Sequence, residues 1–332
     1  MLAGACGLGI GFVVAGASTS LWQFSLAHGV LIGLLGTSAT MAPLVADTSQ
    51  WFTRNRGIAV AICMSGNYLA GVVWAPVMQH FIGTVGWRQT YWGLGLFCCL
   101  SMVLLSLLMR QPVPAATGPQ VSAPVANRAA RFIGAVDHRR PLGFSPGVLQ
   151  ALLCVAGVGC CVAMSMPQVH IVAYCTDLGF GAARGAEMLA VMMGAGIASR
   201  LLSGWISNYL GGLHTLLLGS VLQGVALLLF LPFDGLVPLY VVSALFGLFQ
   251  GGIVPSYALI AREYFGVAHV GARVGTVLMA TLLGMALGGW LSGAIFDWTG
   301  SYHAAFLNGI AWNLLNVGIV VLLIYRSRKG VR

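Results

Sequence analysis

One charged residue, Arg200, lies well inside an apolar stretch, in the segment GAGIASRLLSGW. Placing a cation at the middle of a bilayer costs about 2.5–3.5 kcal/mol on insertion scales. A guanidinium can donate two parallel hydrogen bonds to a carboxylate, and the nearest acids in apolar runs, Asp47 and Glu187, lie at run ends. We therefore predict that Arg200 binds an anion. The alternatives are a side chain that extends toward the cytoplasmic surface and one that bonds backbone carbonyls.

Other polar residues interrupt the apolar runs. Gln250 and Tyr257 are seven residues apart, so they share one helical face. That face should meet protein or water, because polar groups are costly in lipid. We predict that both residues line a cavity, with interhelical hydrogen bonding as the alternative. Asn67 and Tyr68 are candidates to line the cavity from the N-terminal half.

A histidine is the side chain best suited to carry a proton near neutral pH. His170 is near the end of an apolar run and is therefore a candidate proton or substrate site, with a core residue as the alternative. His28 is a weaker candidate. The eight cysteines have no zinc-site spacing, so we interpret them as reduced core residues. No motif indicates a cofactor, a metal centre or an enzyme.

The composition requires these residues to be positioned by membrane helices. The chain has 332 residues, of which 58% are hydrophobic and 7% charged, with a formal charge of +9. A soluble domain carries roughly 25% charged residues, so a soluble enzyme and a disordered chain are both excluded. Long apolar runs are typical of membrane helices, because a helix satisfies its own backbone in lipid. The fold class is therefore an all-α integral membrane protein.

Ten apolar runs are long enough to be candidate spans. They lie near 2–18, 22–46, 57–82, 89–109, 148–173, 184–208, 213–232, 236–261, 272–296 and 303–325. Residues 111–146 contain six prolines and little periodicity, which indicates a linker. We therefore predict a bundle of four helices over 1–110, a cytoplasmic linker over 111–146 and a bundle of six helices over 147–332.

The cations predict the orientation. If the ten helices alternate, thirteen Lys and Arg residues fall on one side and only Arg88 and Arg184 on the other, with Arg200 inside a span. Since cytoplasmic loops are rich in Lys and Arg, the linker and both termini should be cytoplasmic. This topology explains the positive charge without a nucleic-acid partner. No obligate protein partner is evident, and the lipid bilayer is the expected surroundings.

The two halves share a repeated pattern. Trp51-Phe52, a short basic loop and a glycine-containing helix recur 213 residues later from Tyr264-Phe265, in the same orientation. Parallel repeats of membrane helices build one common transporter architecture. The second copy has six helices and the first has four, so we expect that two N-terminal helices are absent from this chain.

This arrangement resembles the major facilitator superfamily, and within it the monocarboxylate transporter and oxalate–formate antiporter branch. The motifs that carry the resemblance are WFTRNRGIA at 51–59 with Ser65-Gly66, Gly86-Trp87-Arg88, FDWTGSY at 296–302 with Ala305-Phe306, and GWISNYLG at 204–211. The resemblance implies an anion-binding arginine at Arg200. It also implies gating or loop roles for Gly204, Asn208, Gly211 and Asp297. Arg54 and Arg56 are candidates for gating salt bridges, with a role as topology signals alone as the other interpretation. Asn208 stands where Asp is usual, and Gly196 stands where many monocarboxylate carriers have Asp.

Together these features predict a secondary carrier of the inner (cytoplasmic) membrane for small organic anions, in particular monocarboxylates. It would work by alternating access, as a symporter with protons or an antiporter of anions. Two alternatives stay open: a non-transporting remnant, and an efflux carrier for apolar, drug-like compounds.

Overall fold

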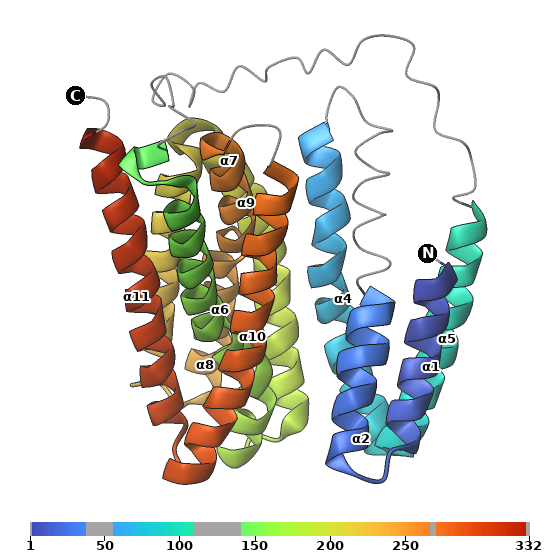
Figure 1. Cartoon of the computed structure of the whole chain (residues 1–332). Coiled ribbons are helices and arrows are strands. Elements are labelled where there is room, and N and C mark those ends of the chain that lie inside the picture. The colour runs from blue at the N-terminus through green and yellow to red at the C-terminus, as the bar shows by residue number, and fades with distance from the viewer. Residues whose placement is uncertain (1, 38–55, 109–140, 266–269, 330–332) are drawn as a thin grey trace. The chain divides into compact units, whose positions relative to one another are not determined.

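The fold is built from helices alone throughout the residues that the structure describes. The computed structural model describes 2–37, 56–108, 141–265 and 270–329, and these ranges contain no strand. Each of the ten predicted spans coincides, over its described residues, with a helical segment (Figure 1). The prediction of an all-α membrane protein is therefore confirmed.

The chain divides into two compact units. Unit 1 comprises Met1–Asn67 and Pro76–Ser122, and unit 2 comprises Tyr68–Ala75 and Ala123–Arg332. The predicted linker over 111–146 lies largely outside the described residues, so its course stays a prediction.

Unit 1 begins with α1 (Leu2–Ala17), which packs against the next two apolar segments. The helix α2 (Leu21–Leu26) continues into the π-helix η1 (Ala27–Thr37), and α1 contacts both η1 and α5 (Trp87–Leu108). The rest of the predicted span 22–46 lies outside the described residues. The helix α4 (Arg56–Val85) contains Pro76.

Unit 2 contains the six predicted C-terminal spans. It begins with the short turn η3 (Pro141–Gly143) and α6 (Pro146–Asp177), and Ser145 caps α6 by accepting from the Val148 N–H. The element α7 (Ala182–Leu229) contains two predicted spans. They are separated by a turn at Gly211, which has a φ of 76°. The helices α8 (Leu236–Gln250) and α9 (Ile253–Tyr264) together make one span. The helices α10 (Val270–Thr299) and α11 (Tyr302–Lys329) complete the bundle, in which α6 packs against α10 and α11, and α7 against α8.

The outer surface of unit 2 suits a lipid environment. Large apolar side chains are exposed along α10, including Leu282 and Leu283, while Phe230, Phe246 and Phe306 are buried inside. Among the described residues, six helical stretches are long and apolar enough to cross a membrane: α5 of unit 1 and five stretches of unit 2, where α8 and α9 count as one. Burial of one face and exposure of an equally apolar opposite face is the pattern of a bundle surrounded by acyl chains.

Glycines bring the helices of unit 2 into close contact. A Cβ atom added at Gly284 would lie 2.7 Å from the Val158 carbonyl oxygen of α6, and one at Gly288 would lie 2.6 Å from the Cα of Val162. This pair therefore lets the two helices pack closely, as do Gly247/Gly251 against α7 and Gly7/Gly11 against η1. At Gly29, by contrast, an added Cβ would meet nothing within 4 Å among the described residues.

The two ends of unit 2 carry opposite charges. The loop end is formed by the α6–α7, α7–α8 and α10–α11 connections and carries Asp177, Glu187, Asp234 and Asp297 beside Arg184. The linker end is formed by the start of α6, the Gly211 turn and the ends of α9 and α11, and carries Arg262, Arg273 and Arg326 beside Glu263. This distribution agrees with the charge asymmetry on which the predicted orientation depends.

Exposed aromatic side chains lie near both ends. Trp298 is 91% exposed at the loop end of α10, and Trp205, Tyr209 and Tyr325 are exposed near the linker end. Tryptophan and tyrosine favour the two interfaces of a bilayer. Their positions therefore indicate where the headgroup layers meet unit 2.

Candidate functional site

Arg200 lies on α7 in the interior of unit 2 and is half-buried. Its Nε donates to the Gly251 carbonyl oxygen at 3.4 Å, between α8 and α9. The Tyr68 ring, which groups with unit 2, lies with its centroid 4.3 Å from the Arg200 Cζ. A guanidinium over an aromatic face gains cation–π attraction. One alternative from the sequence, a bond to a backbone carbonyl, is thus present in this structure.

Gln250 is the last residue of α8, and its side chain is completely buried. Its Oε1 accepts from Gln168 Nε2 of α6 at 3.0 Å, and its Nε2 has no hydrogen-bond partner among the described residues. A buried donor without an acceptor is costly. Such a group is a candidate for ligand contact.

Tyr257 lies on α9, is 0% exposed, and donates to Asn316 Oδ1 of α11 at 2.7 Å. Asn316 in turn donates to Ser220 Oγ at 2.8 Å. The neighbouring residue Asn313 donates to Gln223 Oε1 at 3.2 Å, and all of these side chains are buried. In this structure Tyr257 therefore makes the interhelical hydrogen bond that was its alternative role. Asn313 and Asn316, two amides three residues apart in an apolar run, are the signal that could have predicted this network.

Asn67 and Tyr68 follow one another on α4 but differ in environment. Asn67 is exposed and belongs to unit 1, whereas Tyr68 is buried and contacts Arg200. The structure therefore brings Tyr68 next to the predicted anion anchor.

His170 lies on α6 near the loop end. Its Nε2 is 3.0 Å from the Gly289 carbonyl oxygen of α10, and its ring lies 6.3 Å from that of Tyr302. Because the carbonyl can only accept, Nε2 carries the proton of this bond. His170 is partly buried, and its hydrogen bond runs to α10 rather than to α7 or α8.

The predicted loop motif lies at the linker end of α7. Gly204 and Asn208 are exposed on the last turns before Gly211, where the positive φ favours glycine. Beyond the turn, the Gly212 N–H donates to both carboxylate oxygens of Glu263, at 3.1 and 3.3 Å. Glu263, which sequence reasoning missed, thus caps the second half of α7 from α9.

Three predicted gating residues lie away from this turn. Arg54 is outside the described residues, and Arg56 begins α4 with a side chain that is not described. Asp297 is exposed at the loop end of α10.

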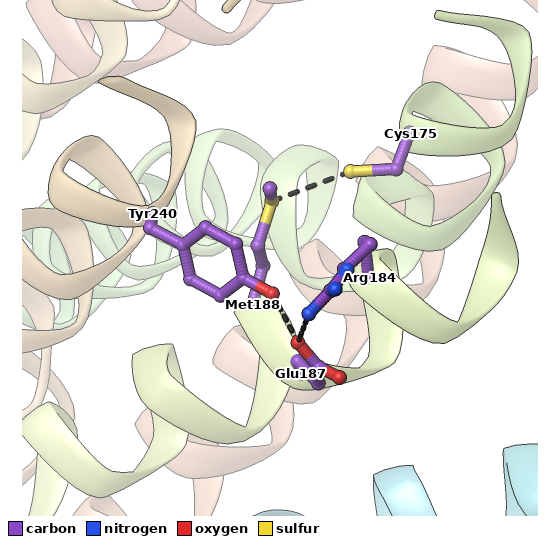
Figure 2. Close-up of polar contacts among 5 residues, drawn as sticks. All are labelled: Cys175, Arg184, Glu187, Met188 and Tyr240. Carbon is purple, nitrogen blue, oxygen red and sulfur yellow. Dashed lines mark hydrogen bonds and ion pairs between the residues drawn. The ribbon is translucent and has the colours of Figure 1, made fainter. Parts of the chain in front are cut away.

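A separate polar cluster joins α7 to α8 at the loop end. Figure 2 shows the Glu187 carboxylate between Arg184 and Tyr240: Arg184 Nη1 lies 2.9 Å from Oε2, and the Tyr240 hydroxyl donates to the same oxygen. The Cys175 thiol lies 3.3 Å from the Met188 Sδ beside it. Arg184 and Glu187 are exposed, so the ion pair adds little to stability.

A shallow groove of 530 Å³ lies between α6 and α10 and is lined mainly by apolar atoms, with Cys154, Thr276 and Met279 among its residues. None of the predicted substrate residues lines it. No group of three or more His, Cys, Asp or Glu side chains that could hold a metal ion occurs in the described part of the chain.

The sequence matches the Major Facilitator Superfamily over residues 1–236 and again over 189–332. The chain belongs to this superfamily of membrane transporters. Monocarboxylate transporter 13 of Bos taurus is 28% identical over 317 residues, which cover 95% of this chain and 70% of that protein. Monocarboxylate transporter 11 of Mus musculus is 29% identical over 307 residues, which cover 90% of this chain and 66% of that protein.

Solved structures of superfamily transporters share the fold. The bacterial homologue of the human lysosomal transporter Spinster has a TM-score of 0.64 at 14% identity, covering 98% of this chain and 82% of that one. The human organic anion transporter MFSD10 has a TM-score of 0.63 at 15% identity, covering 96% and 76%. The expected resemblance to the superfamily is thereby confirmed, and the matched proteins are transporters rather than enzymes.

Proposed function

We propose that this superfamily transporter is a secondary carrier of small organic anions, monocarboxylates in particular, with Arg200 as the anchor for the carboxylate. The observation that carries the proposal is the position of Arg200, half-buried in the apolar interior of unit 2 and held there by the Gly251 carbonyl. A guanidinium in a medium of low polarity attracts a carboxylate strongly. The relatives named monocarboxylate transporters agree with this substrate class.

Gln250 and Tyr68 are the proposed partners of Arg200. The Gln250 amide offers a buried donor, and the Tyr68 ring covers the guanidinium. Tyr257 and Asn67 stay candidates of lower rank, because Tyr257 already bonds Asn316 and Asn67 is exposed.

Transport would proceed by alternating access across a multi-pass membrane protein of the inner membrane whose termini are cytoplasmic. The driving ion would be a proton or an exchanged anion. His170 is the proposed proton carrier, because an imidazole is the side chain best suited to gain and lose a proton near neutral pH.

The test is uptake of labelled propionate, pyruvate and lactate into proteoliposomes that contain the wild-type chain, Arg200→Ala or Arg184→Ala. We expect uptake by the Arg200→Ala protein to fall to the level of empty vesicles, with a normal amount of protein in the membrane. Arg184→Ala removes an exposed cation at the loop end and should transport like the wild type. Undiminished uptake by Arg200→Ala would refute the anion anchor, and export of apolar dyes by that variant would support an efflux carrier instead.

A further inference from the structure

The span made by α8 and α9 is interrupted at its centre. The helix α8 ends at Gln250 and α9 begins at Ile253, with Gly251 and Gly252 as a turn between them. Pro255, the third residue of α9, has no backbone N–H. In an unbroken helix the N–H of residue 255 would donate to the carbonyl of residue 251, four positions earlier. Pro255 therefore leaves the Gly251 carbonyl without its helical donor.

The Arg200 side chain supplies the hydrogen-bond donor that the backbone of Pro255 lacks. Its Nε lies 3.4 Å from the Gly251 oxygen. The approach is possible because α7 and the interrupted span meet backbone to backbone. A Cβ atom at Gly251 would collide with the Gly196 carbonyl oxygen and the Ser199 side chain.

We infer that Pro255 is a positioning residue for the anion anchor, because it frees the carbonyl that orients the Arg200 guanidinium. This inference rests on the proposed function of Arg200. Five N–H donors lie in one plane on a guanidinium, and a bond at Nε fixes that plane. The two terminal nitrogens can then donate two parallel hydrogen bonds to a carboxylate. A side chain held in its binding geometry loses less entropy when the substrate arrives.

A proline inside a membrane helix could instead serve only as a bend for the conformational change. The two roles have different kinetic consequences. Loss of a bend slows the conformational step and lowers the maximal rate, whereas loss of orientation weakens binding and raises the KM.

The experiment compares Pro255→Ala and Pro255→Ser, which both restore the N–H, with Pro167→Ala. Pro167 is also inside a helix. The carbonyl that it leaves without a helical donor is that of Ala163 in α6, and not that of Gly251. Initial uptake rates in proteoliposomes would be measured against the concentration of the fastest of the three monocarboxylates, with Arg200→Ala in parallel. Size-exclusion chromatography in detergent would check that each variant is folded.

We expect both Pro255 variants to raise the KM roughly three- to tenfold while kcat stays within about twofold, as for a lost bond to a charged group. Pro167→Ala should leave the KM unchanged. An unchanged KM in the Pro255 variants, a fall in kcat alone, or an equal rise in KM for Pro167→Ala would overturn the inference. If Arg200→Ala transports normally, the proposed function fails as well; if it is inactive while the KM of the Pro255 variants is unchanged, only the inference fails.

A binding measurement covers the case in which a Pro255 variant folds but transports too slowly for kinetics. The monocarboxylate raises the unfolding temperature of a protein that binds it. The concentration that produces half of this rise should increase by the same factor as the KM. An unchanged concentration would contradict the positioning role.

Discussion

Arg200 on α7 and Gly251 between α8 and α9 are joined by a hydrogen bond of 3.4 Å from Nε to the carbonyl oxygen. This bond links the charged residue of the proposed site to the point where a membrane helix is interrupted. A half-buried guanidinium whose Nε is already bonded to a carbonyl is held in one orientation before any further partner arrives. The same contact therefore helps to explain how Arg200 is tolerated in the apolar interior, and it engages Nε rather than the terminal nitrogens that the proposed anion would contact.

Arg200→Lys tests whether charge or shape matters at the anchor. Lysine keeps the positive charge but lacks the planar fork and the Nε–H that bonds Gly251. We expect a KM for monocarboxylates at least about tenfold above the wild type, measured as initial uptake in proteoliposomes. A KM equal to that of the wild type would show that a point charge is sufficient.

Tyr257→Phe tests the role of the network around Asn316. The variant removes the hydroxyl that donates to Asn316 Oδ1 and leaves a buried acceptor without that donor. We expect the unfolding free energy in detergent to fall by about 0.6–2 kcal/mol while the KM stays unchanged. Tyr209→Phe, at an exposed position, is the control and should change neither quantity. A raised KM at normal stability would instead place Tyr257 in the substrate site.

Gly247→Ala tests the contact between α7 and α8. An added Cβ would collide with the Met192 carbonyl oxygen, and backbone atoms cannot move aside as a side chain can. We expect a loss of roughly 1–3 kcal/mol in unfolding free energy, or a smaller amount of folded protein in the membrane. Gly204→Ala is the matched control, because no described residue lies within 4 Å of its added Cβ, and helix propensity predicts a gain of up to about 1 kcal/mol. Equal stability of the two variants would disprove the close contact.

Glu263 is expected to stabilise the second half of α7. Glu263→Gln keeps one oxygen for the Gly212 N–H but loses the negative charge near a helix N-terminus, which costs about 0.3–1 kcal/mol. Glu263→Ala removes the cap and should cost about 0.5–2 kcal/mol. Thermal unfolding in detergent would rank wild type, Gln and Ala in decreasing order. The capping role is wrong if the alanine variant unfolds at the wild-type temperature.

The sequence predicted the helical spans well, because their length and apolarity are set by the bilayer. It placed a boundary between the runs 184–208 and 213–232, and the structure turns at Gly211 between them. It treated 236–261 as one span, and the interruption at Gly251 and Gly252 was not foreseen. Pro255 is plain in the sequence of this run, but its consequence for the Gly251 carbonyl depends on which residue faces that carbonyl.

Composition and spacing by themselves determined that this chain is a bundle of membrane helices with one arginine in its apolar interior. Those properties follow from the free-energy cost of placing each residue in lipid, and this cost does not depend on neighbours distant in sequence. Only the tertiary structure decided that Arg200 meets Gly251, that Gln168 meets Gln250, and that Tyr257 meets Asn316. Helix periodicity gives the face on which a side chain lies. The partner of that face is fixed by how glycines let the helices approach and rotate against one another.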